Sequence, residues 1–182
     1  GGYNKYIGLA WAQKLAVISP FLRTIAKIPL NNTPATSLGK RWRYFQKLAY
    51  ISHQDPVESS TRVMSIFDHR EVRELAKKGF AGGHALIKDF IGELEQEGIN
   101  NGLRGLNVPM YSDFNFVLPY NMLRKIDLAS MLYNLEVRVP FVDRKVSDLA
   151  LSLPQEWKIK GGRRKRILWQ IASRYFPTSI LR

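Results

Sequence analysis

The chain has 182 residues, of which 45% are hydrophobic and 24% charged, a composition typical of globular proteins. It contains no cysteine, which excludes a disulfide framework and thiol chemistry, and no apolar run approaches the roughly 18 residues that a membrane-spanning helix needs. Its 28 Lys and Arg outnumber its 15 Asp and Glu, and the net charge of +13 favours polyanionic partners. We therefore expect a cytoplasmic protein with no membrane association.

The first half of the chain has the pattern of several helices. Apolar residues recur at helical spacing over residues 6–28, and a loop rich in Asn, Thr, Pro and Gly follows. Short helices are predicted over residues 41–98, with starts at Pro56 and after Asp68, because an acid precedes the first helical turn at both places. A loop is predicted over residues 99–109.

The last third has the most regular helical pattern. Apolar residues three or four positions apart form three stripes, which predict three amphipathic helices. The stripes consist of Leu118, Met122, Ile126, Ala129 and Tyr133, then Val142, Val146, Leu149 and Leu153, then Ile167, Ile171 and Tyr175. Repeats and low-complexity tracts are absent from the sequence, which therefore predicts a mainly α fold.

One short segment, "LEVRVPFVD", alternates apolar and charged residues and so predicts an extended conformation. There Glu136 and Arg138 share one face, whereas Val137 and Val139 share the other, which we expect to face the core. A solvated strand edge with a surface ion pair, contributing at most about 1 kcal/mol, would explain the pattern. A ligand site is the alternative, because the segment adjoins a helix with a polar set of its own. That set consists of Lys125, Asp127 and Ser130.

A basic stretch, "KIKGGRRKRIL" at residues 158–168, leads into the last predicted helix. Two glycines before a helix N-terminus can bind phosphate through backbone N–H groups. A solvated basic turn explains the same residues. The three histidines lack metal-ligand spacing, and no metal site is expected.

The last third of the chain resembles the synthetase domain of the glutamine-dependent asparagine synthetases. The resemblance covers roughly residues 1–6 and 116–182, and residues 7–115 read as a variable helical region. It is carried by Leu118-Pro119, Met122-Leu123, Lys125, Asp127, Ser130-Met131, "LEVRVPFVD", "ALSLP" at residues 150–154, Lys158, Lys160, "KRIL" at residues 165–168, the closing "FPTSILR" and the opening "GGYNKY".

This resemblance implies a fold and a reaction. The chain would be a single helical domain over residues 1–182, the helical C-terminal portion of an ATP-pyrophosphatase-type (adenine nucleotide α-hydrolase-like) α/β synthetase domain whose nucleotide-binding sheet is absent. The implied reaction is adenylation of aspartate by ATP, followed by amidation with ammonia derived from glutamine. ATP with Mg would serve the full-length protein, and no cofactor is expected in this chain.

The resemblance also implies which residues line the site. Glu136, Arg138, Asp127, Lys125 and Ser130 would form the wall of the substrate and ATP site. Gly1, Gly2, Lys160 and Lys165 would lie near the phosphates, and the main catalytic groups would lie outside this chain. The implied partners are the nucleotide-binding and glutaminase parts of the same protein, and self-association through exposed apolar surface is expected.

Other functions stay open at this point. The sequence contains no Ser-Gly-Gly-x-Asp-Ser loop, so the chain is expected to be an inactive fragment of a ligase. Leu128 stands where family members often carry Arg, and Tyr120-Asn121 replaces a commonly acidic pair, which leaves open a related amidotransferase acting on another carboxylate. The net charge of +13 also permits a basic nucleic-acid-binding module.

Overall fold

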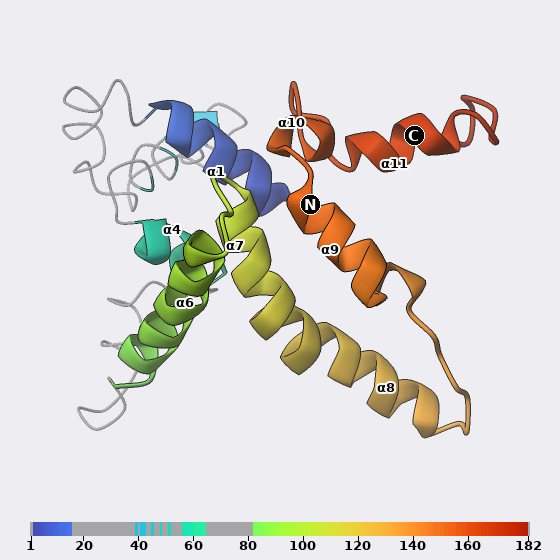
Figure 1. The fold of residues 1–182 in the computed structure, drawn as a ribbon, viewed down its shortest axis with the longest axis horizontal. Coiled ribbons are helices and arrows are strands. Elements are labelled where there is room, and N and C mark those ends of the chain that lie inside the picture. Colours follow the sequence, from blue (N-terminus) through green and yellow to red (C-terminus); the bar gives the residue numbers. More distant parts are fainter. Residues whose placement is uncertain are drawn as a thin grey trace. The chain divides into compact units, whose positions relative to one another are not determined.

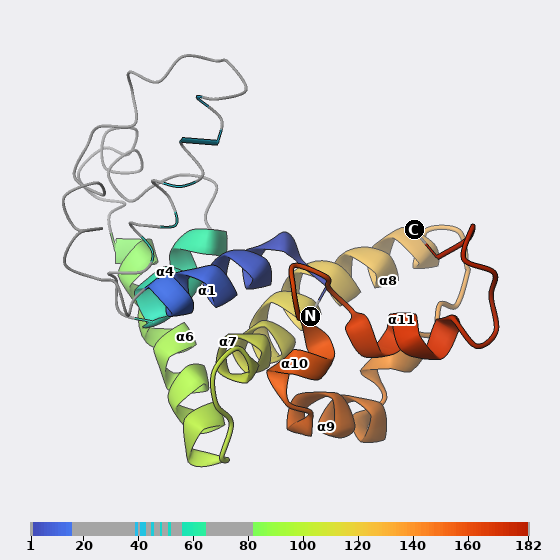
Figure 2. The same ribbon diagram turned by 90° about the horizontal axis from the view of Figure 1, so that it is seen from above.

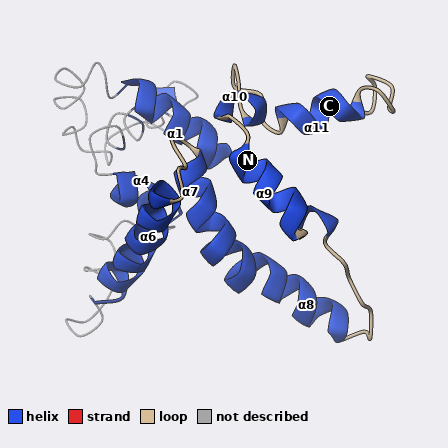
Figure 3. Ribbon diagram, viewed as in Figure 1, coloured by secondary structure: helices blue, strands red, loops and turns tan. Residues whose placement is uncertain are grey.

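A computed structural model describes residues 2–15, 39, 41, 42, 45, 48, 51, 56–64 and 82–181. These residues are mainly helical and contain no strand, as Figure 3 shows, which confirms the predicted mainly α fold. The chain divides into two compact units, residues 2–88 and residues 89–182, and each is described by itself. The expectation of one helical domain over residues 1–182 stays a prediction.

In the unit formed by residues 2–88, helix α1 (Asn4–Leu15) contacts helix α4 (Pro56–Met64). The buried apolar residues of α1 are Tyr6, Leu9 and Ala12, which share a helical face at spacing three. The predicted helix start at Pro56 is confirmed, because α4 begins there and carries Glu58 in its first turn. Residues 16–38 and the helix start predicted after Asp68 lie outside the described residues.

Helix α6 (Gly82–Asn100) leads to α7 (Asn107–Ser112), and the loop between them is shorter than predicted. The sequence predicts Pro109 in this loop, but it lies in the first turn of α7, where the missing N–H costs no helical hydrogen bond. The hydroxyl of Tyr111 donates to Glu97 over 2.8 Å and so joins the two helices.

Helix α7 continues without a break into the π-helix η3 (Asp113–Leu123) and then α8 (Arg124–Met131), so one long helical element runs through the unit (Figures 1 and 2). Pro119 lies inside η3, where its ring and missing N–H disfavour regular α-helical bonding. The N–H of Arg124 reaches back to the carbonyl of Pro119, five residues earlier, which is the π-helical spacing. Phe116 packs edge-on against Phe90 of α6, with ring centroids 5.3 Å apart.

After α8 the chain turns back through the short 3-10 helix η4 (Pro140–Val142) into α9 (Arg144–Ser152), α10 (Gln155–Lys158) and α11 (Arg166–Ala172). Helix α9 contacts α7, and α10 contacts α11. The most completely buried apolar side chains of this unit are Ile91 and Leu106.

The three predicted apolar stripes lie on helices or helix ends, but they are largely exposed. Tyr133, Leu149 and Tyr175 are among the exposed large apolar residues. Periodicity therefore predicted the helices of this unit correctly, whereas no described element covers their apolar faces. Among the described residues, no helix combines the length and the hydropathy that a membrane crossing requires.

Candidate functional site

At the corner between α8 and α9, helix α8 ends in a turn with a left-handed residue. Asn134 has φ 53°, the left-handed conformation that ends many helices. The N–H of Leu135 donates to the carbonyl of Ser130 over 3.0 Å, and the N–H of Asn134 donates to the carbonyl of Met131 over 3.0 Å. These two bonds form a Schellman motif, which fixes the direction in which the chain leaves α8.

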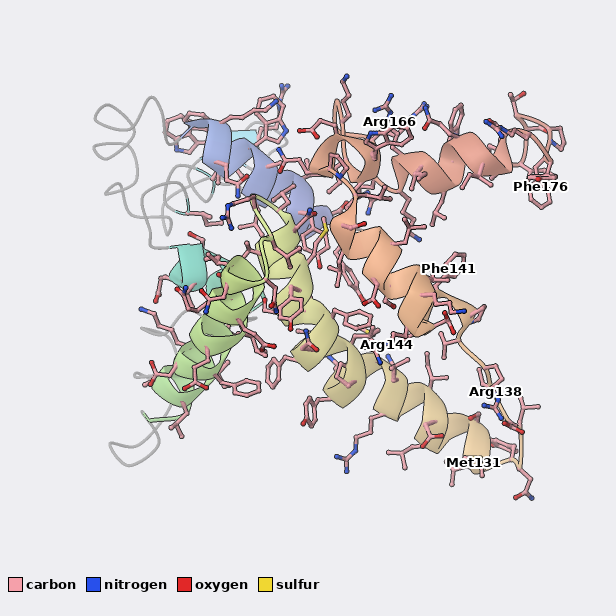
Figure 4. The ribbon with its side chains drawn as sticks, viewed as in Figure 1. Met131, Arg138, Phe141, Arg144, Arg166 and Phe176 are labelled. Atoms are coloured by element: carbon pink, nitrogen blue, oxygen red, sulfur yellow. The ribbon has the colours of Figure 1, made fainter. Side chains whose placement is uncertain are left out.

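Beyond this turn, the extended segment of residues 135–139 presents Glu136 and Arg138 together. The two side chains form an ion pair, as expected for residues two apart on one face of an extended chain. Their side chains are 70% and 87% exposed, so the pair by itself stabilises the fold by less than about 1 kcal/mol. Figure 4 shows Arg138 on the connection between α8 and α9.

The expectation that Val137 and Val139 face a core is wrong. They are 45% and 40% exposed. Among the described residues, no strand pairs with residues 135–139, because the only β bridge there joins Lys160 and Arg163. All five residues of the segment are exposed, so no described element covers either face.

Helix α8 carries the three polar residues that the sequence placed at the same corner. Lys125 and Asp127 are exposed, and Ser130 is half-buried and donates from its Oγ to the carbonyl of Asp127 over 3.1 Å. Asp127 and Ser130 are three residues apart and share a helical face, whereas Lys125 does not share it. Among the described residues, none of the three forms an ion pair with Glu136 or Arg138.

Asp143 directly precedes helix α9, and its carboxylate caps the helix. Its Oδ1 accepts hydrogen bonds from the N–H groups of Lys145 at 2.9 Å and Val146 at 3.4 Å. The carboxylate is therefore engaged with the backbone and fixes where the helix starts.

The basic stretch after α10 folds as a tight hairpin turn and not as a glycine loop at a helix N-terminus. Lys160 and Arg163 exchange two backbone hydrogen bonds of 3.2 and 3.1 Å around Gly161 and Gly162, which have φ 59° and 77°. Positive φ at both central residues is typical of a type I′ turn, and glycine adopts it without a steric penalty. The stretch is thus a basic turn, and the proximity of Lys160 and Lys165 to phosphates stays a prediction.

Around this turn, Arg163 and Arg166 contact neighbouring groups. The guanidinium of Arg163 lies over the ring of Trp169, 4.4 Å from its centroid, and Arg166 donates to the carbonyl of Glu156 over 3.0 Å. Lys160 and Lys165 are exposed. Lys165 directly precedes α11 and has a left-handed conformation with φ 50°. Solvent therefore reaches both ammonium groups, and their proximity to phosphates stays a prediction.

Lys158 differs from its basic neighbours because it is buried. Its Nζ donates to Oδ1 of Asn107 over 2.6 Å and to the carbonyl of Leu151 over 3.3 Å. Burial lowers its pKa to about 8. The side chain of Asn107 also donates to the carbonyl of Leu153 over 3.0 Å. Lys158 therefore joins α10 to the start of α7 and the end of α9.

The sequence did not predict the roles of the side-chain amides of Gln155 and Asn107, which join α10 to the start of α7. Gln155 accepts from the N–H of Leu106 over 3.3 Å, and Asn107 is the partner of Lys158. Both contacts join residues about fifty positions apart, and no local pattern marks them. Their effect is to fix α10, and with it the start of the basic hairpin.

The remaining expectations concern Gly1, Gly2 and metal binding. Gly1 is outside the described residues, and Gly2, which is half-buried just before α1, belongs to the other unit. The described residues contain no group of three His, Cys, Asp or Glu side chains that could hold a metal ion.

A family model described as asparagine synthase matches residues 1–182. Over 76 residues, 42% of this chain, the sequence is 36% identical to "Asparagine synthetase [glutamine-hydrolyzing] 1" of Bacillus subtilis (strain 168). The matched part spans only 12% of that relative's length. No solved structure gives a significant match.

Proposed function

Because the chain belongs to the asparagine synthase family, we propose that it forms part of an ATP-dependent, asparagine synthetase-type amide ligase. In that reaction the side-chain carboxylate of aspartate attacks the α-phosphorus of ATP and pyrophosphate leaves. Ammonia derived from glutamine then attacks the activated carbonyl and AMP leaves. We assign the helices to the helical part of an ATP-pyrophosphatase-type α/β synthetase domain in the cytoplasm.

The observation that supports this proposal is the fixed pair at the corner after α8. A Schellman motif holds the start of the segment and Asp143 caps the helix behind it, so Glu136 and Arg138 are presented from an anchored backbone. Fixed charges aimed at a reacting group contribute more than mobile ones, because they need little reorganisation. Arg138 would orient a carboxylate or phosphate, and Glu136 would orient an ammonium group or hydroxyl of the substrates.

The basic hairpin would serve the phosphates. Lys160 and Lys165 present exposed ammonium groups on either side of a turn that two backbone bonds and the Arg163–Trp169 contact hold in place. Such cations stabilise the negative charge that develops on leaving pyrophosphate. Asparagine synthetases use Mg with ATP, but the described residues offer no cluster of acidic ligands, and we assign no step of the reaction to a metal.

The proposal is tested in a chimera in which this chain replaces the matching part of the Bacillus subtilis synthetase. We expect the chimera to form asparagine from aspartate, ATP and ammonium, and we expect Glu136→Ala and Arg138→Ala to lower the rate by about a hundredfold. Arg144→Ala removes an exposed guanidinium of α9 and is the control, with an expected change below about twofold. If both corner variants kept the rate of the parent chimera, the site assignment would be wrong.

The acceptor and a nucleic-acid role are decided by two further assays. Replacing aspartate by other carboxylates in the chimera would show whether the enzyme amidates another acceptor. The basic hairpin and the net charge of +13 also support polyanion binding. In a filter assay at low and moderate salt, the synthetase proposal predicts only weak nucleic-acid binding, whereas a dedicated module would bind tightly with a steep linear loss in log[salt].

A further inference from the structure

The extended segment of residues 135–139 has backbone groups that form no hydrogen bond with the described residues. Among the described residues, the N–H and C=O groups of Glu136 and Arg138 form no backbone hydrogen bonds. The groups at either end are engaged, since the N–H of Leu135 donates to Ser130 and the carbonyl of Val139 accepts from Val142, both over 3.0 Å. Exposed, unpaired, extended backbone is a template for pairing with another strand.

We infer that this segment pairs with the same segment of a second copy of the chain, as two antiparallel strands related by a two-fold axis at Val137. In that register Glu136 lies opposite the partner's Arg138, and Arg138 lies opposite the partner's Glu136. Opposite charges facing across an antiparallel pair stabilise it. The sequence Glu136-Val137-Arg138 is therefore complementary to itself, which an isologous interface requires.

The free backbone groups select one of the two possible hydrogen-bonding phases. Facing residues in an antiparallel pair alternate between pairs that exchange two hydrogen bonds and pairs that exchange none. If Glu136 and the partner's Arg138 exchange bonds, the symmetric pair does the same and all the unoccupied N–H and C=O groups of these residues are used. In the other phase the N–H of Leu135 would need a new partner, although it already donates to Ser130.

The opposite face of the paired strands would bury apolar side chains that are now exposed. Val137 meets its own counterpart, and Leu135 meets the partner's Val139. Three further exposed large residues flank the strand in the sequence, namely Leu132, Tyr133 and Phe141. Two short strands alone form a marginal interface, so these flanking residues are needed and the dimer is expected to be weak.

This inference does not rest on the proposed ligase function, because it uses only the geometry of residues 135–139. The two are exclusive at any one moment, since a paired segment cannot present Glu136 and Arg138 to a substrate. Ligand binding at the corner and self-association therefore compete, whatever the ligand is.

Sedimentation equilibrium of the full chain, nuclease-treated and at moderate salt, tests the pairing. We expect a monomer–dimer equilibrium with a dissociation constant of about 100 μM. Glu136→Arg places two arginines opposite two arginines, and Arg138→Glu does the same with glutamates, so each should weaken the dimer about tenfold. The double exchange E136R/R138E restores opposite charges and should restore dimerisation to within about threefold.

Mixing the two single variants gives the sharpest readout. Glu136→Arg and Arg138→Glu chains repel themselves but complement each other, so the mixture should form a heterodimer at least as tight as the parent homodimer. A monomer at every concentration, single variants that dimerise as the parent does, or a mixture that stays monomeric would each overturn the inference. Association that vanishes on nuclease treatment would assign the self-association to bridging by nucleic acid and overturn it as well.

Discussion

The free energy of unfolding should increase as the pH rises above about 8, because the buried ammonium of Lys158 then loses its proton. Burial lowers the pKa of this group in the folded chain from its ordinary value of 10.5 to about 8. Between these values the folded state has released the proton while the unfolded state still holds it. Stability therefore rises with pH in this window, and the cost of burying the charged ammonium is fully present below pH 8.

The size of the effect follows from the difference between the two pKa values. The full difference corresponds to at most about 3 kcal/mol, and about 2 kcal/mol of it should appear between pH 7 and pH 9.5. Higher pH is avoided, because burial and a hydrogen bond to Glu97 raise the pKa of Tyr111 and its ionisation would lower stability.

The assay is urea denaturation at pH 7, 8, 9 and 9.5, followed by tryptophan fluorescence, which includes the signal of the neighbouring Trp157. Lys158→Met keeps the length of the side chain but removes the charge, so the rise with pH should disappear. At pH 7 it also leaves Oδ1 of Asn107 without its donor, at a cost of about 1–3 kcal/mol.

Lys160→Met is the matched control, because it removes an exposed ammonium two residues away and should keep the slope of the parent chain. A parent chain whose stability is flat over this pH range, or a Lys158→Met variant that keeps the slope, would refute the reasoning.

Two further predictions concern the segments that position the corner and the hairpin. Asp143→Ala removes the cap of α9 and should lower the free energy of unfolding, measured by urea denaturation, by about 1 kcal/mol. Asp148→Ala changes an exposed position on the same helix and should change this free energy by less than about 0.5 kcal/mol. Equal losses for the two variants would contradict the capping role. Gly105→Ala should cost about 1 kcal/mol more than Gly102→Ala, because both glycines have positive φ but only the new Cβ at position 105 would lie 2.8 Å from Oε1 of Gln155. Matching melting curves for these two variants would argue against the Gln155 contact.

Local signals predicted the helices well. The helix start at Pro56 needed only an acid and a proline in sequence. The helical parts of the last third followed from apolar spacing, even across Pro119, where the chain forms a π-helix instead of breaking. The presence of a helix depends largely on neighbouring residues, and this explains why these predictions held.

Burial and long-range contacts could not be predicted in the same way. The alternation at Val137 and Val139 correctly predicted an extended segment but placed the valines in a core that no described element provides. Lys158 looked like one of several solvated bases, and only its contact with Asn107, 51 residues away, distinguishes it. Periodicity defines which face is apolar, whereas a covering surface is a property of the tertiary structure.

The candidate site was predictable only in part. The sequence correctly placed Glu136 and Arg138 on one face, where they form an ion pair. It did not predict that Lys125 and Asp127 would remain apart from this pair, because the relative direction of α8 and the following segment depends on the Schellman turn at Asn134.

The most direct test of the account is an isotope transfer experiment in the chimera with the Bacillus subtilis synthetase. Aspartate labelled with ¹⁸O in its side-chain carboxylate should pass one label to AMP, because the carboxylate oxygen that attacks ATP leaves with AMP when ammonia displaces it. We predict that Arg138→Ala lowers both labelled AMP and pyrophosphate release, whereas Arg144→Ala changes neither. Undiminished label transfer in the Arg138→Ala chimera would contradict the claim that this corner belongs to the adenylating site.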